Sequence, residues 1–270
     1  MRLQISFTIG AFENTGSAFQ FILDHLNCNM TSIFSNKAYS SNDWITDTDE
    51  IVRELVNTND NSFTIHNGSE PDATLYDENV SMVTFLREQN YQIEILTFDI
   101  EDESFLDLEK LLLAANKLGF TTAQRFDYEK ARWQSEQIVS NFEVFQKTHE
   151  HRQKVVHPVW GKSSGLTIDI SNNPGRDILT FGMRLFAAPE MWFGAGAWQY
   201  FDLNNLLACT IVEESRRITD NLLYVKLFDV DTEDYEHLSI LKLQREFRKC
   251  SKMDEVEELL NNKLPFKRYY

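Results

Sequence analysis

The chain has 270 residues, 42% of them hydrophobic and 25% charged, a composition too apolar for a disordered protein and sufficient for one large or two small domains. Its net charge of −16 argues against nucleic-acid binding, which needs a basic surface, and against docking on an anionic membrane. No apolar run approaches the length of a membrane-spanning helix.

The first 100 residues predict strands interrupted by two helices. Alternating apolar residues over 3–9 are typical of a half-buried strand, and an apolar stripe predicts a helix over 14–26. A second helix, with acidic residues in its first turn, is expected over 47–56. Further strands are expected at residues 31–34, 62–66, 80–86 and 91–98.

Two more helices are expected before residue 150. Ser104 and Asp107 have the spacing of a capping box, an apolar stripe follows, and Gly119 provides the stop signal, so a helix is predicted over 104–118. A long polar helix is predicted over 127–149, with Trp133, Ile138, Phe142 and Phe145 on its buried side.

The second half begins at the glycine- and serine-containing stretch 161–165. It predicts strands at 166–170 and 178–186, an aromatic helix at 196–207, a hairpin of 210–218 with 222–228 around Asp220-Asn221, and helices at 235–249 and 254–262. Strands and helices do not alternate regularly, which favours an α+β fold with mostly antiparallel strands. We predict two mixed sheet-plus-helix subdomains, an acidic one over 1–150 and a near-neutral, aromatic-rich one over 151–270.

The charge is divided unevenly between these halves. Residues 1–150 carry 25 acidic and 10 basic side chains, whereas residues 151–270 carry 17 and 16. A concentrated negative charge steers encounter with a basic partner, so we expect a basic protein as the binding partner.

The cysteines and the amino terminus predict a cytoplasmic location. Cys28, Cys209 and Cys250 are far apart and odd in number, so free, inert thiols are expected in a reducing compartment. The first residues lack the basic and apolar regions of a secretory signal.

Residues of the kind that bind metals or phosphates are present without the spacing that such sites need. His149, His151 and His157 are interpreted as solvated surface residues, as are the isolated His25, His66 and His237. The acidic runs lack the glycine and terminal glutamate of a calcium loop, and Gly194-Ala195-Gly196 lacks a third glycine. We therefore expect neither a metal nor a cofactor.

Residues 181–201 are the most aromatic part of the chain, with Arg184 and Glu190 between the rings. Two interpretations stay open: a core corner, or an exposed pocket or partner surface.

The amino-terminal strand and helix, QISFTIGAFENTGSAFQFILDHL, are followed by SIFSNKAYSSNDW and the Asp-led DTDEIVREL. This order of elements, with Phe7, Phe34 and Trp44, resembles the opening of bacterial polymorphic-toxin immunity proteins. That family has Tyr-Trp-Gly after the first strand, where this chain has FTIG. The resemblance covers the first third of the chain and implies a non-catalytic inhibitor that blocks the active site of one nuclease-fold toxin.

The leading hypothesis is therefore an immunity-type, non-enzymatic inhibitor of a basic partner. The carboxylates predicted to attract this partner, called the steering residues, are Asp47, Asp49, Glu50, Asp99, Glu101, Asp102 and Glu103. The aromatic side chains predicted to become buried in the contact, called the anchors, are Trp192, Trp198 and Tyr200. The alternatives are an enzyme whose pocket is lined by residues 181–201, with His157 as a base, and an adaptor or structural protein.

Overall fold

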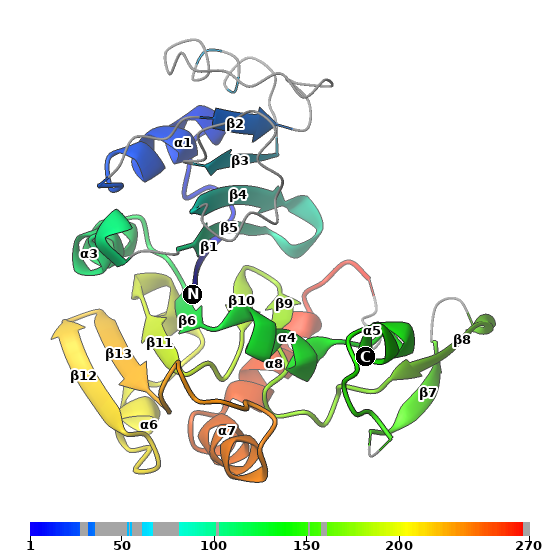
Figure 1. Cartoon of the computed structure of the whole chain (residues 1–270). Helices are drawn as coiled ribbons and strands as arrows, with labels where there is room; N and C mark the ends of the chain where they lie inside the picture. The colour runs from blue at the N-terminus through cyan, green and yellow to red at the C-terminus, as the bar shows by residue number, and fades with distance from the viewer. Residues whose placement is uncertain are drawn as a thin grey trace.

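The computed structural model describes residues 1–27, 32–35, 53, 55, 61–66, 81–100, 103–150, 152–157 and 161–266. They form an α+β fold built on one large antiparallel sheet, as the sequence predicts (Figure 1). Among these residues no helix is long and apolar enough to cross a membrane.

In the described part of the chain the large sheet contains nine strands in the order β12-β13-β11-β6-β1-β5-β4-β3-β2, with every neighbouring pair antiparallel. Two small hairpins, β9–β10 and β7–β8, lie outside it. The strand bounds are β1 (Arg2–Thr8), β2 (Ser32–Ser35), β3 (Ser62–His66), β4 (Met82–Glu88), β5 (Ile93–Asp99), β6 (Thr122–Phe126), β7 (Lys154–His157), β8 (Gly161–Ile168), β9 (Ile178–Thr180), β10 (Met183–Leu185), β11 (Glu190–Phe193), β12 (Glu214–Thr219) and β13 (Leu222–Lys226).

Helices cover both faces of the sheet. Their bounds are α1 (Thr15–Leu23), α3 (Leu108–Lys117), α4 (Tyr128–Ser135), α5 (Val139–Val144), α6 (Leu203–Leu207), α7 (Leu238–Cys250) and α8 (Met253–Asn261), with short 3₁₀ turns η1 (Gln89–Tyr91), η2 (Glu103–Phe105) and η3 (Ala195–Gln199). The helix expected over 47–56 lies outside the described residues, apart from residues 53 and 55.

The alternating pattern of the first strand is confirmed and explains how the sheet is buried. Leu3, Ile5 and Phe7 point into a core cluster that also contains residues of α1 and α3. A second core cluster lies on the opposite face, where Met191 and Phe193 of β11 pack with residues of α7 and α8. Because successive strand residues point to opposite faces, one sheet serves both cores.

The sheet also crosses the predicted subdomain boundary. β6, from the acidic half, pairs with β11 from the second half through Arg125–Glu190 and Ala123–Trp192. The two halves of the chain therefore share one continuous hydrogen-bonded sheet.

Local capping decides where the helices begin. Asn14 and Ser17 form a reciprocal capping box at the start of α1. At α3 the sequence-based start was wrong: Asp107, rather than Ser104, accepts the hydrogen bond from Lys110 N that caps the helix. Gly119 has φ of 75°, a conformation that glycine adopts without strain, and it ends the helix as expected.

The long helix predicted over 127–149 is two short ones. α4 and α5 are separated because residues 137 and 138 pair with β8 instead of continuing the helix. Ile168 N and the Thr167 hydroxyl both donate to Gln137 O, and the Glu136 carboxylate accepts from Ile138 N. Apolar periodicity could not reveal this break, because it depends on a strand 30 residues away.

Two strands and a turn replace the single strand predicted over 178–186. β9 and β10 form a hairpin through Gly182, whose φ is 71°. The hairpin predicted around Asp220-Asn221 is confirmed as β12–β13. The last two helices are also confirmed as α7 and α8.

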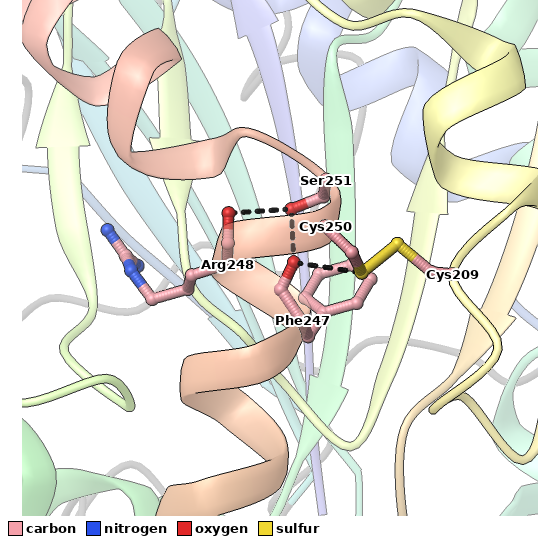
Figure 2. Close-up of a disulfide and its surroundings, with 5 residues drawn as sticks. All are labelled: Cys209, Phe247, Arg248, Cys250 and Ser251. Carbon is pink, nitrogen blue, oxygen red and sulfur yellow. Dashed lines mark hydrogen bonds between the residues drawn. A yellow bond between two sulfur atoms is a disulfide. The ribbon is translucent and has the colours of Figure 1, made fainter.

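The expectation of three free thiols is wrong for two of the cysteines. Cys209, which follows α6, and Cys250, the last residue of α7, form a disulfide (Figure 2). Cys209 is buried in the second core cluster, and Cys250 packs against that cluster. The pairing was missed because the two residues are 41 positions apart in sequence and meet only in the folded chain.

Candidate functional site

The most promising surface for binding is a groove between α3 and the outer strands of the sheet. It consists of two adjoining cavities of about 330 and 180 Å³, which share Leu108 and Arg125 in their walls. We call it the α3 groove. The larger cavity is lined by Leu108, Glu109, Leu112, Leu113, Arg125, Glu190, Trp192, Glu214, Arg216, Ile218, Leu222 and Tyr224.

Asn116, near the end of α3, holds the wall of the groove in place. Its side-chain N–H donates to Asn221 Oδ1 at 2.8 Å, in the turn between β12 and β13. Its oxygen accepts from Ala195 N, also at 2.8 Å, at the start of η3. The almost fully buried side-chain amide of Asn116 therefore connects α3 both to the turn between β12 and β13 and to η3.

The floor of the groove is aromatic. Trp192 of β11 lies opposite Tyr224 of β13, and the centroids of their rings are 5.2 Å apart. Arg216 of β12 is the next residue across the sheet, and its guanidinium lies 5.7 Å from the centre of the Tyr224 ring. Strand alternation places these three side chains on the same face, away from Met191 and Phe193.

A second row of side chains on this face is charged. Arg125 Nη1 lies 3.2 Å from Glu190 Oε2, and the Tyr224 hydroxyl donates to Glu190 Oε1 at 3.3 Å. Burial, followed by the nearby Glu190 carboxylate, raises the pKa of Tyr224 above its ordinary value of 10. At neutral pH the phenol is thus protonated and acts as a hydrogen-bond donor.

The rim of the groove is exposed and carries both signs of charge. Arg216 Nε lies 3.4 Å from Glu214 Oε1, and their side chains are 62% and 50% exposed. Glu109, in the first turn of α3, is exposed on the opposite wall. The groove can therefore hold a group by stacking on its floor and by ion pairing at its rim.

The structure describes few of the predicted steering residues. Asp47, Asp49, Glu50, Glu101 and Asp102 lie outside the described residues, and Glu103 begins η2. Asp99 ends β5, where its two carboxylate oxygens accept from Arg2 at 2.6 and 2.7 Å. This fork neutralises the charge of Asp99 locally, so Asp99 adds little to a long-range field.

The three predicted anchors do not form one patch. Trp192 is 5% exposed and lines the α3 groove. Trp198 donates its indole N–H to Asn221 O at 2.9 Å, and with Tyr200 it packs on the second core cluster. The Tyr200 ring lies 4.7 Å from the Lys263 ammonium.

The aromatic segment 181–201 belongs mainly to the core. Phe186, Phe193 and Phe201 are buried in the second core cluster, which favours the core interpretation over a pocket lined by this whole segment. Its two charged residues are each paired, Arg184 with Asp177 and Glu190 with Arg125. The proposed base His157 lies in β7, in a separate two-stranded sheet.

Among the histidines that the structure describes, His66 differs from its predicted surface position. His66, at the end of β3, is only 4% exposed, and burial lowers its pKa. His237 is exposed, as expected, and caps α7. Among the described residues no cluster of three or more His, Cys, Asp or Glu side chains could hold a metal ion.

The sequence did not predict most of the residues that line the α3 groove. Arg125, Glu214, Arg216 and Tyr224 come from β6, β12 and β13 and meet Trp192 only through strand pairing. The predicted hairpin around Asp220-Asn221 contained the one usable signal. It places Arg216 and Tyr224 on neighbouring strands.

Comparisons of the chain with protein-family models, with curated proteins and with solved structures find no match.

Proposed function

We propose that this protein is a non-catalytic, protein-binding inhibitor of the immunity type, which neutralises a basic partner such as a nuclease-fold toxin by occluding its active site. The observation that carries the proposal is the segregation of charge. Residues 1–150 hold 25 acidic against 10 basic side chains, and the remaining 120 residues are almost neutral. The resemblance of the first third of the chain to immunity proteins supports the same function.

The proposed mechanism has two steps. The acidic half first attracts a basic surface over a distance of about one Debye length, roughly 8 Å at physiological ionic strength. Contacts at the α3 groove then give the complex its lifetime, because aromatic side chains in a partly desolvated site contribute most to slow dissociation. Glu109 and Glu214 on the rim supply carboxylates at the point of contact.

Cytoplasmic location stays a prediction, and the disulfide counts against it. Disulfides persist in oxidising compartments and are rare in a reducing cytosol. The test is to isolate the protein separately from the cytoplasm and from an oxidising compartment and to count its free thiols. If the bond between Cys209 and Cys250 is found only in protein from the oxidising compartment, the folded protein acts in that compartment.

The experiment that tests the proposed function is capture followed by inhibition. The full chain is used as bait in lysate of the source cells, and bound proteins are eluted with increasing salt. A basic protein that is retained at high salt is then purified, and its activity is measured with and without one equivalent of the bait. Loss of activity at one equivalent supports the proposal, whereas capture without inhibition, or no capture, overturns it.

A charge series separates steering from tight binding. In the first variant Glu101, Asp102 and Glu103 are replaced by Gln, Asn and Gln. The control replaces Glu246, Glu255 and Glu258, three exposed carboxylates of the C-terminal half, by Gln. We expect the first variant to lower the association rate and its salt dependence, and the control to leave both unchanged. Equal effects from the two sets would contradict steering by the acidic half.

A further inference from the structure

The mouth of the α3 groove holds a guanidinium group that belongs to the protein itself. Arg216 lies over the Tyr224 ring at 5.7 Å and against Glu214 at 3.4 Å, although 62% of its side chain is exposed. A long, solvated side chain loses rotamer freedom when it adopts one such position. The position therefore marks where the groove favours a planar cation, through the face of an aromatic ring and an adjacent carboxylate.

We propose that the α3 groove binds an arginine side chain of a basic protein partner, and that Arg216 occupies this position in the free protein. The partner's guanidinium would stack on Tyr224 beside Trp192 and pair with Glu214, while Arg216 moves aside. The inference rests on the proposed function only for the nature of the partner. The preference of the groove for arginine stands on its own geometry.

The lining matches an arginine along its whole length. Apolar side chains of Leu112, Leu113 and Ile218 line the cavity where an aliphatic stem would lie. The cavity of about 330 Å³ is large enough for one long side chain. Exposed carboxylates stand on both walls, Glu109 on α3 and Glu214 on β12.

The charges of the groove favour a cation over an anion. The lining of its larger cavity has three carboxylates and two guanidinium groups. Arg125 is engaged by Glu190, which also accepts from Tyr224, so the floor holds a compensated pair. Arg216 is likewise paired with Glu214, and an anion would have to compete with that carboxylate for it.

The test uses small probes, so it needs no partner. The indole N–H signal of Trp192, assigned by comparison with Trp192→Phe, is followed by NMR while a probe is added. The probes are N-acetyl-arginine amide, its uncharged isostere N-acetyl-citrulline amide, and N-acetyl-glutamate amide. We expect a saturable shift with the arginine probe and none with the other two.

Arg216→Ala is the decisive variant, because it empties the position that the probe would occupy. We expect it to bind the arginine probe about two- to fivefold more tightly, the factor that corresponds to one exposed cation–π contact. The matched control is Arg217→Ala. It removes the same charge from the next residue of β12, whose side chain points to the other face, and it should leave affinity unchanged. Glu214→Gln should weaken binding by about two- to fivefold.

Three results would overturn the inference. They are a larger shift with the glutamate probe, weaker arginine binding in Arg216→Ala than in the wild type, and equal binding of the citrulline and arginine probes. The first would make the groove an anion site that uses Arg216, and the second would show that Arg216 does not occupy the position of the probe. These outcomes are independent of the capture experiment, so a partner could be inhibited through another surface, and an arginine site could exist without a toxin.

Discussion

Breaking the bond between Cys209 and Cys250 should remove a large part of the stability of the fold. The disulfide closes a loop of 41 residues, and the loop-closure entropy that it removes from the unfolded chain corresponds to about 4 kcal/mol at 25 °C. For a chain of this length, such a loss lowers the melting temperature by roughly 8 °C or more. The bond ties the segment after α6 to the end of α7, so the second core cluster should loosen first.

The assay compares oxidised and reduced protein in urea, with tryptophan fluorescence as the probe of unfolding. Cys28→Ser protein is used throughout, so that the third cysteine takes no part in exchange. Alkylation and mass spectrometry count the free thiols at each point. Two results would refute the reasoning: two free thiols in protein purified without reductant, or a fully reduced sample whose free energy of unfolding changes by less than about 1 kcal/mol.

Three further predictions concern local contacts. Gly194→Ala should cost about 1–3 kcal/mol in urea unfolding, because the new Cβ would lie 2.5 Å from the Phe120 carbonyl oxygen. Asn116→Ala should cost a similar amount, about 1–3 kcal/mol, because it removes two hydrogen bonds that each contribute about 0.5–1.5 kcal/mol, and it should shift the NMR signals of the α3 groove. Burial acts to raise the pKa of Asp254, but the Arg248 guanidinium holds it below 3.8, so stability is lost as the pH falls through that lowered pKa. Asp254→Asn should therefore flatten the acid side of the stability curve.

Two of these predictions have a matched control variant. For the acid series it is Glu255→Gln, the next residue of α8, whose exposed carboxylate should leave the slope unchanged. For Asn116 it is Lys117→Ala, at the exposed end of the same helix. An Asn116→Ala protein with unchanged stability and unchanged groove signals would contradict the role given to this amide. If Gly194→Ala is as stable as the wild type, the close approach of Phe120 is wrong.

Sequence patterns were informative where structure is local. The strand at β1, the helix α1 and the hairpin around Asp220-Asn221 follow from alternation, capping and turn residues within a few positions. The α+β class followed from the order of these elements. The prediction of one helix over 127–149 was wrong for the opposite reason. The break between α4 and α5 is imposed by pairing with a strand that is distant in sequence.

The candidate site depends on pairing between strands that are far apart in sequence, so most of its residues could not be predicted from sequence patterns. Trp192 was identified from its aromatic neighbourhood, but nothing in the sequence paired Glu190 with Arg125, 65 positions away. Strand β6 was overlooked altogether, and with it the link between the two halves. The disulfide was missed on the same ground, since spacing alone does not show which cysteines meet.

The position of β1 in the sheet has a consequence for synthesis of the chain. β1 is made before both of its neighbours, because it pairs with β5, up to residue 99, and with β6, up to residue 126. At translation rates of about 5–20 residues per second, the strand waits roughly 6 to 25 s for both neighbours. During that interval Leu3, Ile5 and Phe7 have no sheet to enter, so the nascent chain presents an apolar strand to whatever lies near the ribosome. Ribosome-associated chaperones should therefore contact this protein early, and release it only after residue 126 has emerged.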